Sequence, residues 1–175
     1  MIRTAHTFEV DEATRAAARE LLYAAFPWEM TEEDWEHCLG GIHALAYEGG
    51  ELVGHAAVIQ RRLLYAGRAL RTGYVEGVAV RADQRRRGHG AAMLAALEPV
   101  IRGAYDLGAL GATDEGARLY AANGWRRWEG PVSSLTLEGL RRRPEEDGDI
   151  WVRETSVPLD VTRPLACDWR DGDLW

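Results

Sequence analysis

Hydrophobic positions recur with a helical period in the first part of the chain. Within residues 12–26, Leu21, Leu22 and other apolar residues share one face of a helix. Asp11 is a residue type that commonly caps helices, and Pro27 cannot continue one. The pattern therefore predicts an amphipathic helix over 12–26. The same reasoning predicts three further helices, at 32–39, 91–101 and 114–122.

Shorter apolar runs bounded by glycine predict strands. The pair Gly49-Gly50 separates the runs 42–48 and 51–60, as in a β-hairpin. A second hairpin is expected at Ala66-Gly67, between strands over 62–65 and 68–74. Other strands are expected at 2–10, 75–80, 105–112, 125–128, 132–137 and 150–159, with a surface loop at 138–149 and an irregular tail at 160–175.

The order of these elements is β-α-α-β-β-β-α-β-α-β-β. No internal repeat and no linker interrupts it, and 175 residues are enough for one hydrophobic core. A mixed order of this kind is typical of an α/β fold in three α/β/α layers with a largely antiparallel sheet. We therefore expect a single domain spanning residues 1–175.

Composition excludes several classes of protein. The formal charge is −7, from 28 acidic and 21 basic residues, which disfavours a nucleic-acid partner and favours a cationic substrate. The chain has no long apolar run and no signal-peptide core, so we expect no membrane partner and a cytoplasmic location. The two cysteines, Cys38 and Cys167, match no metal spacing, and no metal site is expected.

The most informative segment is a basic, glycine-rich turn between the strand 75–80 and the helix that follows. Such a turn directs backbone N–H groups and a helix N-terminus at one point, as a pyrophosphate requires. The chain contains no lysine, which excludes a P-loop. A dinucleotide fingerprint would place its third glycine at Met93. What remains is the pattern Arg-x-x-Gly-x-Gly, formed by Arg85, Gly88 and Gly90.

This pattern resembles the acetyl-coenzyme A loop of the GCN5-related N-acetyltransferases (GNAT). A second motif of that family is similar to residues 116–125, in which Tyr120 follows Ala117-Arg118-Leu119 and precedes Gly124-Trp125. The resemblance implies acetyl-CoA as cosubstrate. It also implies that the cofactor contacts the backbone of Val78, Ala79 and Val80 and the loop residues Arg85, Arg86, Arg87, Gly88, His89 and Gly90.

Acetyl transfer to an amine needs a base for the ammonium and an acid for the departing thiolate. Glu76 lies in the apolar strand before the loop, where burial would raise its pKa toward the range useful for a base. The resemblance gives Tyr120 the role of general acid. The N–H of Val78 is the candidate contact for the thioester carbonyl, and Gly77 permits a bulge beside it.

Four stretches, 31–45, 56–65, 73–83 and 167–175, further resemble the aminoglycoside 2′-N-acetyltransferases. This likeness implies a role in antibiotic resistance, a cationic aminoglycoside as substrate and a homodimer. It places the substrate against Glu29, Glu76, Gly77, Gly111, Glu146, Asp173 and Trp175. The family often has aspartate at positions 29 and 146 and a small hydroxyl residue at position 111.

Two alternatives stay open at this point. The chain could acetylate another amine, such as a polyamine or an amino sugar, or it could bind acyl-CoA or an aminoglycoside without chemistry. Retention of both Glu76 and Tyr120 argues against the second alternative. The acidic, tryptophan-containing segment 168–175 is expected to be docked on the protein and to line the substrate pocket.

Overall fold

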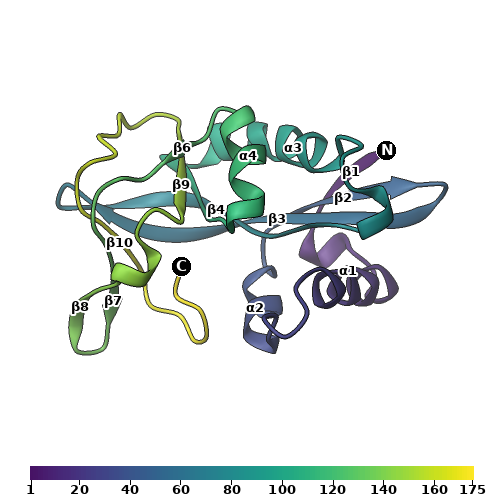
Figure 1. The fold of residues 1–175 in the computed structure, drawn as a ribbon, viewed down its shortest axis with the longest axis horizontal. Coiled ribbons are helices and arrows are strands. Elements are labelled where there is room, and N and C mark those ends of the chain that lie inside the picture. The colour runs from purple at the N-terminus through teal and green to yellow at the C-terminus, as the bar shows by residue number, and fades with distance from the viewer. The chain divides into compact units, whose positions relative to one another are not determined.

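The computed structural model describes all 175 residues, which divide into two compact units (Figure 1). The first unit comprises Met1–Ile59 and Val75–Pro99, and the second comprises Gln60–Tyr74 and Val100–Trp175. The chain therefore passes from one unit to the other three times. That all of it forms a single domain stays a prediction.

Three elements contribute residues to both units: β3 (Glu51–Tyr65), β4 (Arg68–Val80) and α3 (His89–Ala104). The first unit also contains β1 (Ile2–His6), α1 (Glu12–Ala25), α2 (Glu32–His37), β2 (Ile42–Glu48) and the 3-10 turns η1 (Thr7–Glu9) and η2 (Ala82–Gln84). The second contains β5 (Leu107–Gly111), α4 (Asp114–Ala122), β6 (Arg126–Arg127), β7 (Val132–Thr136), β8 (Gly139–Arg142), η3 (Pro144–Glu146), β9 (Ile150–Glu154) and β10 (Leu165–Cys167).

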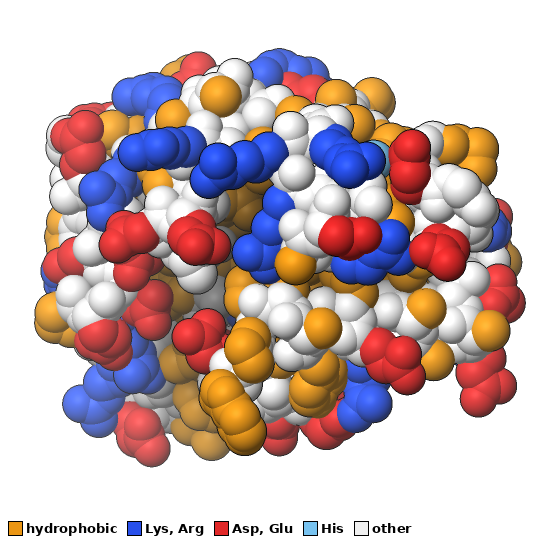
Figure 2. Space-filling model, turned by 45° about the vertical axis from the view of Figure 1, so that its right-hand side comes forward, with side chains coloured by type: hydrophobic (Ala, Val, Ile, Leu, Met, Phe, Trp, Pro, Cys, Tyr) orange, Lys and Arg blue, Asp and Glu red, His pale blue; other side chains and the backbone are white.

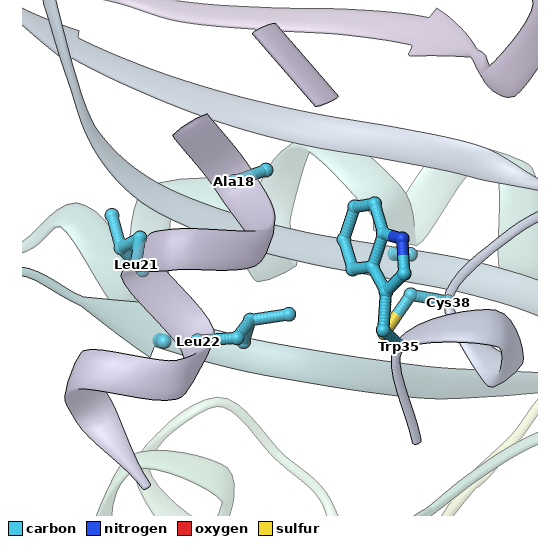
Figure 3. Packing of buried hydrophobic residues seen from close by; sticks show 7 residues of the cluster. Ala18, Leu21, Leu22, Trp35 and Cys38 are labelled. Atoms are coloured by element: carbon cyan, nitrogen blue, oxygen red, sulfur yellow. The ribbon is translucent and has the colours of Figure 1, made fainter. Parts of the chain in front are cut away.

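In the first unit, two capped helices pack through a small hydrophobic cluster. The carboxylate of Asp11 accepts the N–H of Thr14 at 2.9 Å, and Thr31 forms a reciprocal capping box with Asp34. Figure 3 shows Leu22 of α1 and Trp35 of α2 pointing toward one another within the cluster. The predicted N-cap Asp11 and the predicted starts of both helices are confirmed.

In the second unit the strands follow the order β6-β9-β5-β4-β3-β10-β7-β8. Strands β4 and β5 are parallel, as are β7 and β10, whereas β5/β9, β6/β9, β7/β8 and β3/β10 are antiparallel. The β1/β2 and β2/β3 pairs of the first unit are antiparallel too. The prediction of a mixed, largely antiparallel sheet with helices is confirmed.

Several predicted boundaries are wrong: the strands expected at 68–74 and 75–80 form the single strand β4, and the strands expected at 2–10 and 150–159 end early, at His6 and Glu154. The polar residues 60–62 suggested a break, but β3 runs without interruption because the charge of Arg61 is paired inside the protein. The expected loop 138–149 contains β8, a short strand whose arginines are exposed. The expected irregular tail contains β10, whose three residues are too few to form a recognisable pattern.

The surface carries both signs of charge. Figure 2 shows acidic and basic side chains interspersed over the visible face, with hydrophobic side chains between them. None of the helices is long and apolar enough to span a membrane.

Candidate active site

The proposed coenzyme loop lies in the first unit, between the end of β4 and the start of α3. Residues 85–88 are exposed, and Arg86 and Gly88 have positive φ angles of 62° and 86°. A Cβ on Gly88 would meet no atom within 4 Å, so the loop needs glycine there for backbone conformation rather than for space. Alternating conformations of this kind turn successive N–H groups toward one point and favour an anion.

Two arginines of this loop, Arg86 and Arg87, remain available to a ligand, whereas Arg85 Nε donates to Val80 O at 3.2 Å. Neither Arg86 nor Arg87 is engaged by a carboxylate. By contrast, the nearby Arg81 is held by Asp83 at 2.7 Å and by Glu51 at 2.9 Å. The loop therefore presents guanidinium groups whose hydrogen-bonding capacity is unused.

The first turn of α3 completes the anion site. The Nε2 atom of His89 is enclosed by the fold and has no hydrogen-bond partner. The first hydrogen bond of the helix runs from Ala92 N–H to Gly88 O at 3.0 Å. The N–H groups before Ala92 therefore have no acceptor within the helix. Free guanidiniums, a helix N-terminus and an orphaned ring nitrogen together fit the pyrophosphate of acetyl-CoA. His89, which the family resemblance assigns to the coenzyme loop, is the first residue of this helix.

Glu76, the candidate base, is half-buried in β4 between the buried Val75 and Gly77. Gly77 has a φ of 56°, so the strand departs from regular geometry directly after the carboxylate. A Cβ on Gly77 would lie 2.6 Å from the Sγ atom of Cys38, which no side chain tolerates. The structure thus contains the irregularity that the sequence suggested at Gly77.

Glu29 also belongs to the first unit, in the connection between α1 and α2. Its N–H donates to Phe26 O at 3.3 Å, and its side chain is exposed. The preceding residue, Trp28, is fully exposed and has a positive φ of 74°. Glu29 therefore lies in a tight turn whose backbone is strained for a non-glycine residue.

Tyr120, the candidate acid, lies in the second unit on α4. Its side chain is 6% exposed and its ring contacts two tryptophans, Trp125 at 6.3 Å and Trp151 at 6.5 Å between ring centroids. The backbone N–H of Trp125 donates to Tyr120 O at 3.1 Å, just after the helix ends. Aromatic packing on two sides limits the directions in which the phenol can point.

Two predicted substrate residues of the second unit come together at the end of β5. A Cβ built on Gly111 would lie 3.7 Å from the terminal carbon of Trp175 and 3.6 Å from Tyr74 Oη. Trp175 itself is 5% exposed, and its indole Nε1 is buried without a partner. The tail is therefore docked, as predicted.

Carboxylates gather in the same unit around η3. The pKa of Glu146 is raised, first by burial and then by the neighbouring charges of Asp173, Asp149 and Glu145. Arginines neutralise this group only in part, since Arg143 lies 3.6 Å from Glu145 and Arg127 lies 3.9 Å from Asp149, and the remaining negative charge suits a cationic substrate. The structure thus brings Glu146 and Asp173 within electrostatic reach of each other.

Sequence reasoning missed the residue that holds the tail, Arg61. Its side chain is 3% exposed; Nε donates to Asp168 Oδ1 at 2.9 Å and Nη2 donates to Leu174 O at 2.7 Å. A signal was present, because Arg61, Leu63 and Tyr65 are alternate residues of one strand and all three are buried. An arginine on the buried side of a strand needs an acidic partner elsewhere.

A second arginine, Arg170, completes the attachment of the tail. It donates to Asp173 O at 2.6 Å and to Trp175 O at 3.0 Å. The guanidiniums of Arg61 and Arg170 lie 4.7 Å and 5.6 Å from the centre of the Tyr74 ring. Cation–π contacts therefore reinforce the hydrogen bonds that fix the last residues.

Comparison with known proteins identifies the family. Residues 2–126 match the model of an acetyltransferase (GNAT) domain. The chain is 48% identical to an aminoglycoside 2′-N-acetyltransferase of Mycolicibacterium fortuitum, over 99% of this chain and 91% of that protein.

Solved structures agree on the fold. An aminoglycoside 6′-N-acetyltransferase complexed with coenzyme A superposes with a TM-score of 0.62 at 16% identity, covering 90% of this chain and 99% of that one. The ribosomal-protein-S18-alanine N-acetyltransferase of Escherichia coli gives 0.59 at 18% identity, covering 91% and 97%. The chain therefore belongs to the GNAT family of acetyltransferases.

Proposed function

We propose that this protein transfers the acetyl group of acetyl-CoA to the 2′-amine of an aminoglycoside. The observation that carries the proposal is the extent of the likeness to a 2′-N-acetyltransferase. The family model ends at residue 126, whereas the relative matches over 99% of the chain. The likeness therefore extends through the region that contains Glu146, Asp173 and Trp175.

When bound, acetyl-CoA supplies the activated acetyl thioester. In the proposed mechanism Glu76 accepts a proton from the 2′-ammonium, directly or through one water molecule. The N–H of Val78 is the proposed donor to the thioester carbonyl, and the phenol of Tyr120 is the proposed proton donor to the sulfur. Arg85, Arg86, Arg87 and the start of α3 would hold the pyrophosphate.

Substrate selection is assigned to the acidic residues. Glu29, Glu146 and Asp173 would pair with ammonium groups, and the docked Trp175 would add its indole. Gly111 would contribute only backbone, since it has no side chain. We also infer a homodimer acting in the cytoplasm. Light scattering in solution measures the mass of the assembly and so tests the dimer. The first residues to mutate are the exposed leucines of the β7–β8 hairpin, Leu135, Leu137 and Leu140.

The regiochemistry is tested with two matched drugs. Tobramycin carries an amine at the 2′ carbon and kanamycin A carries a hydroxyl there. Release of free thiol from acetyl-CoA should be rapid with tobramycin and slow or absent with kanamycin A. Equal turnover of both would mean that another amine is acetylated, and turnover of neither would refute the proposed substrate class.

The catalytic roles are tested by substitution. Glu76→Gln and Tyr120→Phe should each lower kcat by about 10²–10⁴-fold without loss of coenzyme binding. Glu138→Gln and Tyr23→Phe make the same chemical changes at exposed or partly exposed positions and should leave kcat unchanged. An unchanged rate in both active-site variants would remove Glu76 and Tyr120 from the mechanism.

A further inference from the structure

A chain of four hydrogen bonds runs through the first unit and ends on strand β4. Gly40 N–H donates to Thr7 Oγ1 at 2.8 Å, and Thr7 Oγ1 lies 2.8 Å from His43 Nε2. The Nδ1 atom of His43 lies 2.9 Å from His55 Nε2, and Nδ1 of His55 lies 2.8 Å from the carbonyl oxygen of Gly77. His43 is 1% exposed and His55 is fully buried.

Chemistry fixes the direction of this chain. The carbonyl of Gly77 can only accept, so Nδ1 of His55 carries the hydrogen. Burial lowers the pKa of both histidines to about 4, so each ring is neutral and has one donor and one acceptor. His43 therefore donates to His55 and accepts from the Thr7 hydroxyl, whose other possible acceptor, Gly41 O, is farther away at 3.3 Å. Every donor points toward Gly77.

Gly77 needs this support because its conformation is unusual for a strand. With a φ of 56°, its carbonyl leaves the direction of a regular strand residue. The atoms around it leave no room for adjustment: a Cβ at this position would lie 2.6 Å from Cys38 Sγ and 3.1 Å from Leu22 Cδ1. Figure 3 shows the Leu22 and Cys38 side chains in this cluster. A buried carbonyl left without a donor would cost about 1–3 kcal/mol, enough to shift the local backbone.

We propose that His55 is a positioning residue for acetyl transfer: by holding the Gly77 carbonyl, it fixes the backbone between Glu76 and Val78. This inference rests on the proposed function, in which Glu76 is the base and Val78 N–H contacts the thioester carbonyl. Rotation of the peptide between Gly77 and Val78 would turn the Val78 N–H away from the thioester carbonyl. A misplacement of about 1 Å can lower a rate on the order of 10²-fold.

A purely structural role makes a different prediction. The His55 ring also packs 6.0 Å from Trp35 and 5.2 Å from His43 between centroids, so its loss would destabilise the core in any case. Replacing a residue that only packs in the core lowers stability, and it lowers kcat only because part of the enzyme is unfolded. A positioning residue affects kcat in the folded protein, and the effect is reversed by a side chain that restores the donor.

The test compares His55→Leu with His55→Asn in the full chain. The asparagine amide nitrogen lies close to the position of Nδ1 and can donate to Gly77 O, whereas leucine cannot. We expect His55→Leu to lower kcat for tobramycin about 10–100-fold with little change in KM for acetyl-CoA. His55→Asn should recover most of that loss although both variants lose the bond to His43.

Leu97→Ala is the matched control. Leu97 is fully buried on α3 within the same unit and is not among the nearest neighbours of Gly77, so its truncation lowers Tm without touching the histidine chain. Its kcat should stay at the wild-type value. Equal kcat in the leucine and asparagine variants, or a loss in Leu97→Ala that matches the same fall in Tm, would overturn the proposal.

An NMR measurement separates this proposal from the proposed function. The ¹³C′ shift of Gly77 and the ¹⁵N shift of Val78 should move in His55→Leu and return toward wild type in His55→Asn. Unmoved shifts would overturn the positioning role even if the enzyme is active. If His55→Leu fails to fold, Thr7→Val replaces it, because it breaks the hydrogen-bond chain at its partly exposed end. This variant should give the same shift changes at smaller amplitude. Unmoved shifts in it would overturn the proposal equally. Wild type that does not acetylate tobramycin would refute only the function.

Discussion

Two arginine-containing regions of this protein use the same side chain in opposite ways. In the coenzyme loop, Arg86 and Arg87 are exposed and engaged by no carboxylate. In the tail region, Arg61 is 3% exposed and donates to Asp168 and Leu174. The loop keeps its charge for a ligand, and the tail region uses its charge for the fold.

The two regions prepare for their ligands in different ways. The guanidiniums of the loop are hydrated before a ligand binds. When a phosphate binds, they exchange this water for charge-assisted hydrogen bonds. A tail of acids and tryptophans would fray without attachment. The entropy cost of ordering it would then be incurred on binding and would weaken substrate affinity. Arg61 and Arg170 order the tail in advance.

Removing the buried arginine should give the largest effect. Arg61→Ala leaves Leu174 O without its donor and removes the charge partner of Asp168, which is 34% exposed and keeps the N–H of Arg62; losing such a partner costs about 1–3 kcal/mol. We expect a large fall in the free energy of unfolding, measured by urea denaturation. The neighbouring Arg62 is exposed, and Arg62→Ala should change it by less than about 0.5 kcal/mol. Comparable losses in the two variants would contradict the buried role of Arg61.

Removing residues 173–175 should separate substrate from coenzyme. The deletion takes away Asp173 and the buried Trp175 but leaves the loop intact. We expect aminoglycoside affinity to fall about 10–100-fold, as for an interface that loses an anchor residue, while acetyl-CoA affinity stays within about threefold. Calorimetric titration of each ligand measures both. Equal weakening of both ligands would show that the tail serves the fold alone.

Mild acid should distinguish the two units. His55 has a folded pKa of about 4 against 6.5 unfolded, so the unfolded chain binds more protons below pH 6.5 and stability falls as pH is lowered toward 4. Between pH 6.5 and 5 this amounts to about 1.5 kcal/mol for His55. Glu146 behaves in the opposite sense, because a raised carboxyl pKa in the fold favours the folded state as pH falls.

Hydrogen exchange can follow this effect in each unit. After correction for the intrinsic rate, amides of β2 beside His43 should exchange faster at pH 5 than at pH 7. Amides at the start of β9, close to η3 in sequence, should lose less protection. Equal changes in both units would mean that protonation of the histidine pair is not the cause.

Neutralising the loop should give the smallest effect. Arg86→Ala and Arg87→Ala each remove one exposed charge, worth roughly 0.3–1 kcal/mol of coenzyme binding, and the double variant should lose part of the salt dependence. Affinity for coenzyme A at low and high salt measures this, with Tm unchanged. Arg141→Ala, an equally exposed arginine on β8, should alter neither quantity. A fall in Tm in the loop variants would contradict the idea that these arginines are uncommitted.

The same comparison explains what could be predicted from the sequence. The coenzyme loop depends on residues within a few positions of one another, so Arg85, Gly88 and Gly90 suffice to identify it. The helix starts at Asp11 and Thr31 are local in the same sense, and the structure confirms them. The tail depends on Arg61, which is 107 positions from Asp168 along the chain. No local pattern encodes that separation.

Some strand boundaries were predicted wrongly for a related reason. Polar residues inside β3 looked like a break because their partners lie elsewhere in the chain, and β10 is buried by strands on both sides rather than by its own pattern. Nothing in the sequence joins Thr7, His43, His55 and Gly77. Their hydrogen bonds became visible only with the fold.

The placement of β10 has a consequence for biosynthesis. Leu165 pairs with Tyr65 of β3 and with Val132 of β7. Neither strand can pair with β10 until residues much later in the chain have been synthesised. At about 5–20 residues per second, the nascent chain keeps the edge of β3 open for several seconds. Such an edge is a template for pairing with other chains. Slower translation should therefore increase misassembly during expression, and chaperones that cover strand edges should raise the yield of folded enzyme.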